Sequence, residues 1–286
     1  MKKLLSFFLL FISFLPLFGE GEGKHVLLAI LARNKEHMLP TFLHSIENLE
    51  YGKKNITIYI NTNNNSDTTE TILTEWVKKQ EPNYKKIIFD SHQVPELSFK
   101  SPHEWSLDRL KTLALIRNKS LQAALKNQCD YYFVVDCDNF IIPSTLADLV
   151  AKDLPIVAPM LRSIPQPGDI VSNFFAAVSS TGYYACAPEY YDIVFKRKIG
   201  TFKVPLVHCT YLIKKEFLET LSYTDDTNDY EFIIFARMAR KNHINQYICN
   251  EKEYGYNINF FKKPSLSEEK DIFASLVPCI NALISR

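Results

Sequence analysis

The chain has 286 residues and a formal net charge of +1, and its composition is 47% hydrophobic and 23% charged. So large an apolar share excludes an intrinsically disordered chain. The 33 lysines and arginines face 32 aspartates and glutamates, so the sequence lacks the basic excess of a protein that binds nucleic acid electrostatically. The length suits one large α/β domain or two small ones.

The N-terminus differs in composition from the rest of the chain. Lysines at positions 2 and 3 precede an apolar run over 4–18, and a polar, glycine-containing stretch follows. This order is typical of a secretory signal peptide, which we place at 1–19, because the run is shorter than the roughly 20 residues that span a bilayer. The alternative is an uncleaved membrane anchor. We therefore expect an endoplasmic reticulum lumen location for a eukaryotic source, and a periplasmic, secreted or membrane-anchored protein for a bacterial one.

The first half of the chain alternates apolar strands with helices. Continuous apolar runs predict buried strands, which are expected at 25–32, 56–60, 86–90 and 131–135. Helical spacing of apolar residues predicts helices between them, at 38–49, 67–77 and 106–126. This alternation indicates βαβ units and an α/β fold, with a mostly parallel central sheet flanked by helices.

The second half is less regular. Strands are expected at 156–160 and 206–213, and helices at 144–152 and 231–242. No internal repeat or linker is visible, so we predict one domain over 24–265. Apolar residues at helical spacing in 266–286 predict a C-terminal helical tail. The six cysteines form no Cys-x-x-Cys pair, which argues against a structural zinc site.

The strongest local signal is Asp136-Cys137-Asp138, which follows the predicted strand 131–135. Residues i and i+2 of an extended chain point to the same side, so the two carboxylates converge at the carboxyl end of a strand, where open α/β sheets bind ligands. Two hard oxygen ligands suit Mn²⁺ or Mg²⁺ bridging a nucleotide diphosphate. The alternative is an ordinary solvated acidic turn.

Two other kinds of nucleotide site lack their motifs. A dinucleotide-binding domain needs Gly-x-Gly-x-x-Gly after its first strand, but Ala32-Arg33-Asn34 follows the strand here. A phosphate-binding loop of the Gly-x-x-x-x-Gly-Lys-Ser/Thr kind is also missing from the sequence. What remains is a nucleotide-sugar site in which side chains and a metal hold the diphosphate.

Several further segments, in order along the chain, resemble the N-terminal glycosyltransferase domain of procollagen galactosyltransferases. They are 29–34, 61–67 with Trp76, Glu104-Trp105-Ser106, 135–139, 157–160, 182–184, 204–210 and 249–255. The resemblance covers about residues 25–260. It implies a GT-A fold, a UDP-sugar donor and Mn²⁺, and the family transfers galactose to hydroxylysine of collagen.

The resemblance also implies roles at the ends of the first two strands. Arg33 and Asn34 are expected to meet the nucleotide, and a surface salt bridge is the alternative for Arg33. Asn61, Asn63 and Asp67 lie where GT-A folds recognise uridine, although asparagine and aspartate also favour ordinary turns.

Three more positions have both a functional and a structural interpretation. Arg117 is expected near the nucleotide, as in similar enzymes, or else on a solvated helix face. His208 is a candidate third metal ligand or acceptor contact, or else a core histidine. Glu231 and Asp229 precede an apolar helix, where inverting GT-A enzymes place the carboxylate that deprotonates the acceptor hydroxyl. N-capping and the helix dipole are the alternative there.

Two functional hypotheses follow. The first is a metal-dependent, inverting hexosyltransferase that moves a sugar, galactose by resemblance, from a UDP-sugar to a hydroxyl of a protein or glycan acceptor. The second is a catalytically inactive GT-A-like domain that serves as a binding or accessory module, because the family's second glycosyltransferase domain is not contained in this sequence.

Trp105 and Tyr184 are expected to stack on a sugar or base, or to pack in the core. The sequence leaves the oligomeric state open.

Overall fold

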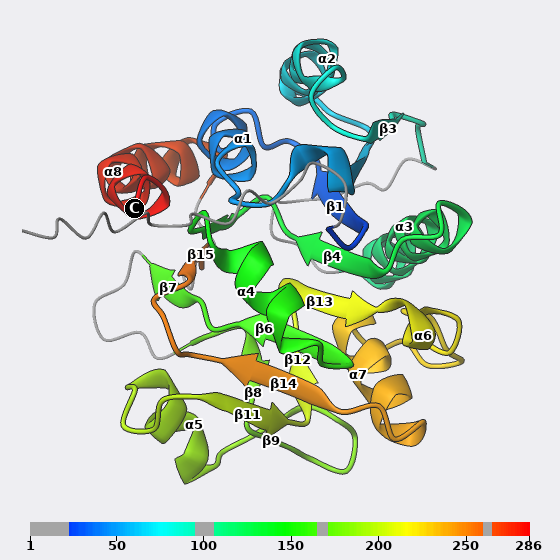
Figure 1. Ribbon diagram of the computed structural model, residues 1–286, viewed down its shortest axis with the longest axis vertical. Coiled ribbons are helices and arrows are strands. Elements are labelled where there is room, and N and C mark those ends of the chain that lie inside the picture. The colour runs from blue at the N-terminus through cyan, green and yellow to red at the C-terminus, as the bar shows by residue number, and fades with distance from the viewer. Residues whose placement is uncertain (1–22, 95–105, 165–170, 260–264) are drawn as a thin grey trace, which may run out of the picture.

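The computed structural model describes residues 23–94, 106–164, 171–259 and 265–286 (Figure 1). The leader predicted at 1–19 and the side chain of Trp105 lie outside the described residues. Within them, no helix combines the length and the apolar character needed to cross a membrane.

The centre of the fold is an eight-stranded sheet in the order β11-β14-β6-β13-β4-β1-β2-β3. The predicted α/β class is confirmed, and four of the seven neighbouring pairs are parallel. The sheet is mixed because β13 lies antiparallel between β4 and β6, and β11 lies antiparallel to β14. Its strands are β1 Val26–Ala32, β2 Ile56–Thr62, β3 Lys86–Asp90, β4 Tyr131–Val135, β6 Ile156–Pro159, β11 Thr201–Val204, β13 Thr210–Lys214 and β14 Gln246–Cys249.

Helices cover both faces of this sheet, which gives three layers (Figure 1). Successive residues of β1 enter two different cores, Val26 and Leu28 on one face and Leu27 and Ala29 on the other, because strand side chains alternate. The first core is closed by α1 Leu39–Glu47, α2 Thr69–Gln80, α4 Thr145–Lys152 and α8 Leu266–Ile284. The second is closed by α3 Leu107–Lys126, α5 Pro188–Val194, α6 Lys215–Leu218 and α7 Glu231–Lys241.

Smaller sheets shape the edge where the strands β1, β2 and β4 end. The three-stranded one has the order β5-β15-β7, and its first strand begins immediately after the acidic motif. The backbone N–H of Ile258 on β15 donates to the carbonyl oxygen of Asp138 at 2.9 Å, so β15 fixes the acidic loop. The remaining elements are β5 Asn139–Ile141, β7 Arg162–Ile164, β8 Phe174–Phe175, β9 Ala177–Val178, β10 Tyr184–Ala185, β12 Leu206–Val207, β15 Gly255–Ile258 and the 3₁₀ turn Lys53–Asn55.

The predicted strand 206–213 is wrong as a single element. The structure divides it into β12 and β13, separated by His208 and Cys209. Cys209 has a φ of 64°, in the left-handed region, so the chain leaves the extended conformation there. The apolar pattern continues across this turn, which is why the sequence does not show it.

The C-terminal stretch forms α8, which lies beside α1 (Figure 1). Phe273, Ile280 and Leu283 are buried on its inner side, and Phe273 stacks on Phe140 of β5 with ring centroids 5.6 Å apart. The Ser265 side chain accepts from the N–H of Glu268, which completes a capping box at the start of the helix. The last helix of the chain therefore packs against the strand that follows the acidic motif.

Gly255 generates a prediction about stability. It lies opposite Ile141 across the β15–β5 ladder, and a Cβ at this position would lie 2.1 Å from the backbone oxygen of Phe140. Gly255→Ala is therefore expected to lower the free energy of unfolding by about 1–3 kcal/mol, measured by urea denaturation. Gly52→Ala is the matched control, because its Cβ would meet the movable Asn55 side chain at 3.1 Å. Equal effects of the two substitutions would contradict this account of the β15–β5 contact.

Candidate active site

The parallel strands β1, β2 and β4 end at the same edge of the sheet, and a cavity of about 520 Å³ opens there. This is the edge at which open α/β sheets bind ligands. Eight of the residues singled out from the sequence line the cavity: Arg33, Asn61, Asn63, Arg117, Asp136, Asp138, His208 and Glu231.

The two aspartates of the acidic motif differ in their surroundings. The Asp136 carboxylate accepts hydrogen bonds from Nη2 of Arg117 at both oxygens, each at 2.9 Å. For Asp138, burial raises the pKa to about 6, Lys35 opposes this shift, and Asp136 adds to it. A carboxylate whose charge is poorly solvated in this way is stabilised by a cation placed beside it. Asp138 is half-buried, which favours the metal interpretation over a fully solvated turn.

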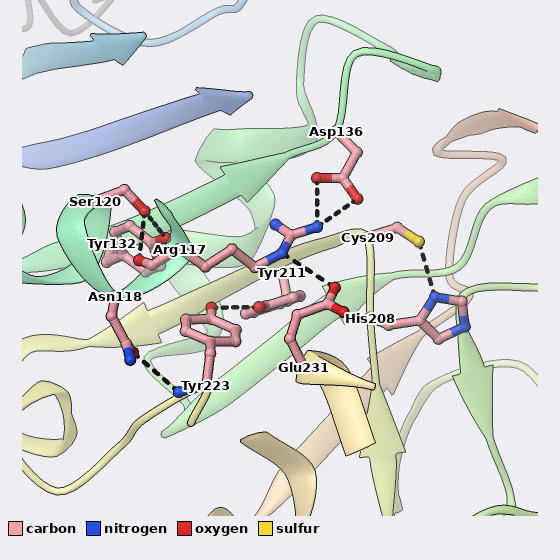
Figure 2. A network of polar contacts seen from close by, with 10 residues as sticks. All are labelled: Arg117, Asn118, Ser120, Tyr132, Asp136, His208, Cys209, Tyr211, Tyr223 and Glu231. Carbon is pink, nitrogen blue, oxygen red and sulfur yellow. Dashed lines mark hydrogen bonds and ion pairs between the residues drawn. The ribbon is translucent and has the colours of Figure 1, made fainter. Parts of the chain in front are cut away.

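Arg117 connects three elements, as Figure 2 shows. It projects from α3, binds Asp136 after β4, and donates through Nε to Oε1 of Glu231, the first residue of α7, at 3.3 Å. Its side chain is only 7% exposed, so the solvated-face alternative is wrong. Although burial lowers its pKa, the carboxylates of Asp136 and Glu231 raise the pKa of Arg117 well above the ordinary value. Arg117 is a permanent cation in the lining of the cavity.

Glu231 is the predicted catalytic carboxylate that lies in the cavity. It is 4% exposed, and burial raises its pKa while Arg117 opposes the shift. Oε2 of Glu231 and Nη1 of Arg117 are buried and have no hydrogen-bond partner among the described residues. A buried polar atom without a partner costs about 1–3 kcal/mol, so these two atoms keep a hydrogen-bonding capacity that no described residue uses.

Asp229, the other predicted catalytic residue, is not among the residues that line this cavity. Its carboxylate accepts hydrogen bonds from the Tyr183 hydroxyl at 2.7 Å and from Arg237 Nη2 at 2.5 Å. The bond from Arg237 lowers the pKa of Asp229. The structure thus places Asp229 in a surface ion pair.

Asn34 and Asp67 join the loops that follow β1 and β2. The side chain of Asn34 accepts from the N–H of Ser66, and Asp67 accepts from the N–H groups of Glu36 and Thr69. Neither residue is among those that line the cavity. Their hydrogen bonds hold the two loops together beside it.

Asn61 and Asn63 lie at the end of β2, and both are buried. The Asn63 side-chain amide donates to Oδ1 of Asn61 at 3.2 Å, which orients the pair in the cavity wall.

His208 lies at the turn between β12 and β13, and its Nδ1 is 2.8 Å from Sγ of Cys209. Burial lowers its pKa to about 4, so the imidazole is neutral. Its ring centroid lies 5.2 Å from that of Phe232 and 5.8 Å from that of Phe175. His208 therefore forms part of an aromatic wall, and its neutral ring retains the capacity to bind a metal or an acceptor hydroxyl.

The sequence analysis missed several lining residues. Phe175, Tyr230 and Phe232 form the aromatic side of the cavity, and in a chain with 20 phenylalanines and 15 tyrosines nothing distinguishes them beforehand. Lys35 also lines the cavity, two residues after Arg33. Its place in the loop that follows the first strand is the signal that could have found it.

The residues of the cavity fit a divalent metal. Asp136 and Asp138 offer hard oxygen ligands, and Mn²⁺ or Mg²⁺ in nucleotide sites is often held by one or two carboxylates together with substrate phosphates. In the described part of the chain, no three or more histidine, cysteine, aspartate or glutamate side chains are grouped so that they could hold a metal ion. All six cysteines are unpaired.

Comparison with known proteins places the chain in a family. Residues 23–276 match the description "Glycosyltransferase family 25, N-terminal domain". The chain belongs to this family. It is 35% identical to human procollagen galactosyltransferase 2 over 93% of this chain and 43% of that protein. It is 32% identical to the mouse protein named inactive glycosyltransferase 25 family member 3, over 88% of this chain and 44% of that protein. The chain thus spans less than half the length of either relative.

Solved structures confirm the GT-A fold. Staphylococcus aureus TarS in complex with UDP-GlcNAc aligns with a TM-score of 0.54 at 14% identity, over 82% of this chain and 59% of that chain. A mannosyltransferase of Pyrobaculum calidifontis in complex with GDP-Man and Mn²⁺ aligns with a TM-score of 0.52 at 14% identity, over 92% of this chain and 70% of that chain. At this identity the likeness concerns the fold.

The buried ion pairs of Arg117 lead to a second prediction. Arg117→Met leaves Asp136 and Glu231 without their cation, and removal of one partner of a buried pair is expected to cost about 3–5 kcal/mol of unfolding free energy. Urea denaturation measures the loss. Arg237→Met is the control, because its partner Asp229 is 24% exposed and such a pair contributes about 1 kcal/mol or less. A loss for Arg117→Met no larger than that of the control would refute the structural role.

Proposed function

We propose that this family 25 domain is a metal-dependent glycosyltransferase that transfers a sugar from a UDP-sugar to a hydroxyl acceptor with inversion at the sugar carbon. The observation that carries the proposal is the acid pair Asp136 and Asp138 at the carboxyl end of β4. The pair lies in a cavity that the Arg117 cation also lines. The names of the relatives favour galactose as the sugar and hydroxylysine of a collagen-like protein as the acceptor. A compartment that receives such acceptors fits the leader expected at 1–19.

Asp136 and Asp138 would hold Mn²⁺ or Mg²⁺ together with the phosphates of the donor. His208, the candidate third ligand, lines the same cavity but is not grouped with the two aspartates as a three-residue metal site in the described part of the chain. The metal would supply Lewis-acid neutralisation of the diphosphate leaving group. Asn61 and Asn63 present amide groups in the same wall, where they would bind the uracil or ribose by hydrogen bonds. Arg33, also in the wall, would contact the phosphates.

Glu231 is the base in this proposal. Its Oε2 is buried in the cavity region without a described partner, and burial raises its pKa toward the range in which a carboxylate accepts a proton effectively. Oε1 is bound to Arg117, which fixes the orientation of the carboxylate. Asp229 is engaged by Arg237 and Tyr183 instead, so the geometry favours Glu231.

A second candidate function is a family 25 domain without turnover that binds a nucleotide sugar or a partner enzyme. The observation that favours this candidate is the mouse relative named inactive, which is similar over 88% of this chain. Turnover by the isolated chain would exclude it.

The metal-dependent site predicts a specific binding defect. Wild-type protein should bind UDP in the presence of Mn²⁺, and Asp138→Asn should weaken this binding by at least about tenfold, because the amide carries no charge for the metal. Isothermal titration calorimetry measures both. Asp148→Asn on α4, which is not a cavity residue, should bind like wild type. If wild type shows no Mn²⁺-dependent binding of UDP, the proposed function is lost.

The assignment of the base predicts a separation of binding from chemistry. Glu231→Gln should keep UDP affinity within about threefold and lower kcat for sugar transfer by about 10²–10⁴, the usual contribution of a positioned base. Initial rates with a UDP-sugar and a hydroxylysine peptide measure kcat. Asp229→Asn should retain wild-type kcat. The reverse pattern would move the role of base to Asp229.

A further inference from the structure

The loop after β1 connects the cavity to the last helix of the chain. Lys35 in this loop lines the cavity, and its side chain is 21% exposed. Its ammonium donates to Oε1 of Glu269 in the first turn of α8 at 3.0 Å. A residue of the cavity wall is thus held by a residue 234 positions later in the chain.

Glu269 is built into the interior. Its side chain is 2% exposed, and Oε1 also lies 3.2 Å from Nε2 of His37. The His37 ring lies edge-on to Phe273 of α8, with centroids 5.9 Å apart. Two basic side chains of the β1–α1 loop therefore meet one buried carboxylate of α8, and the packing of α8 fixes the position of all three.

Lys35 lines the same cavity as the acid pair. Although burial lowers its pKa, the carboxylates of Asp138 and Glu269 raise the pKa of Lys35 above its ordinary value, so the ammonium is charged. An ammonium has three N–H donors, and Glu269 is the one side chain among the described residues that hydrogen-bonds to it. Lys35 therefore has donors left for an anionic ligand beside Asp138.

Arg117, the buried cation of the site, already faces two carboxylates. Arg117 is neutralised by Asp136 and Glu231, which together carry two negative charges when both are ionised. A nucleotide diphosphate adds further negative charge beside Asp138. A positive charge that is already held in place favours binding of the diphosphate, because ordering a flexible lysine during binding would cost affinity.

We propose that Lys35 binds the diphosphate of the donor beside the acid pair, and that Glu269 of α8 is its positioning residue. The inference rests on the proposed function, since it concerns the same nucleotide site. It makes α8 a contributor to donor binding, through one buried ion pair.

The test compares UDP with uridine, which has no phosphate, by calorimetry with Mn²⁺ and with a chelator in place of Mn²⁺. Lys35→Met should weaken UDP binding about tenfold in both conditions and leave uridine binding unchanged, because it removes a charge-assisted contact to phosphate. Lys35→Arg should restore most of the affinity. Glu269→Gln should weaken UDP binding less, and the double substitution should be no weaker than Lys35→Met alone.

The control is Lys270→Met. Lys270 pairs with Glu36 at 2.5 Å and so joins the same loop to the same helix, outside the cavity. It should bind UDP like wild type, and thermal unfolding should show that every variant tested is folded. If Lys35→Met binds UDP with wild-type affinity while Asp138→Asn loses Mn²⁺-dependent binding, the role of Lys35 is overturned and the proposed function stands. Unchanged binding in Glu269→Gln overturns the positioning role. No UDP binding by wild type overturns the proposed function itself.

Discussion

The Arg117 guanidinium is the constraint around which the site is organised. A buried cation must be paired, and its two partners come from different parts of the chain: Asp136 follows β4, and Glu231 begins α7. The network continues below it, where Tyr211 and Tyr223 share a hydrogen bond (Figure 2). The acid loop, the long helix α3 and the proposed base are thereby fixed relative to one another.

Much of this arrangement is readable from the sequence, for local reasons. The apolar run at 131–135 forms β4 with the predicted bounds, because a strand buried on both faces needs only continuous apolar residues. Strands in parallel register bring their carboxyl ends together, so Asp136, Asp138 and Arg33 could be assigned to one edge before any coordinates. The predicted helix at 231–242 correctly places Glu231 at its start.

The remainder depends on contacts that sequence patterns do not encode. Nothing in α3 shows that Arg117 faces inward, because its partners lie 19 and 114 positions away. Asp229 and Glu231 are two residues apart and look equivalent, yet one meets Arg237 at the surface and the other Arg117 in the interior. Cys209 has a left-handed backbone conformation that separates two strands, yet the apolar sequence pattern continues across it. The position of the Lys35 ammonium depends on Glu269 of α8, which lies 234 positions later in the chain.

The position of β13 has a consequence for how the molecule is made. β4 receives β13 as its antiparallel neighbour, so the strand that carries the acid pair stays a sheet edge on that side until residues 210–214 have been synthesised. Pairings between such distant segments form slowly, because a long loop must close first. During translation the N-terminal βαβ unit is thus expected to have an open strand edge and an Arg117 that can pair with Asp136 but not yet with Glu231. Until β13 and α7 have left the ribosome, the open edge of β4 is a surface through which the nascent chain can aggregate.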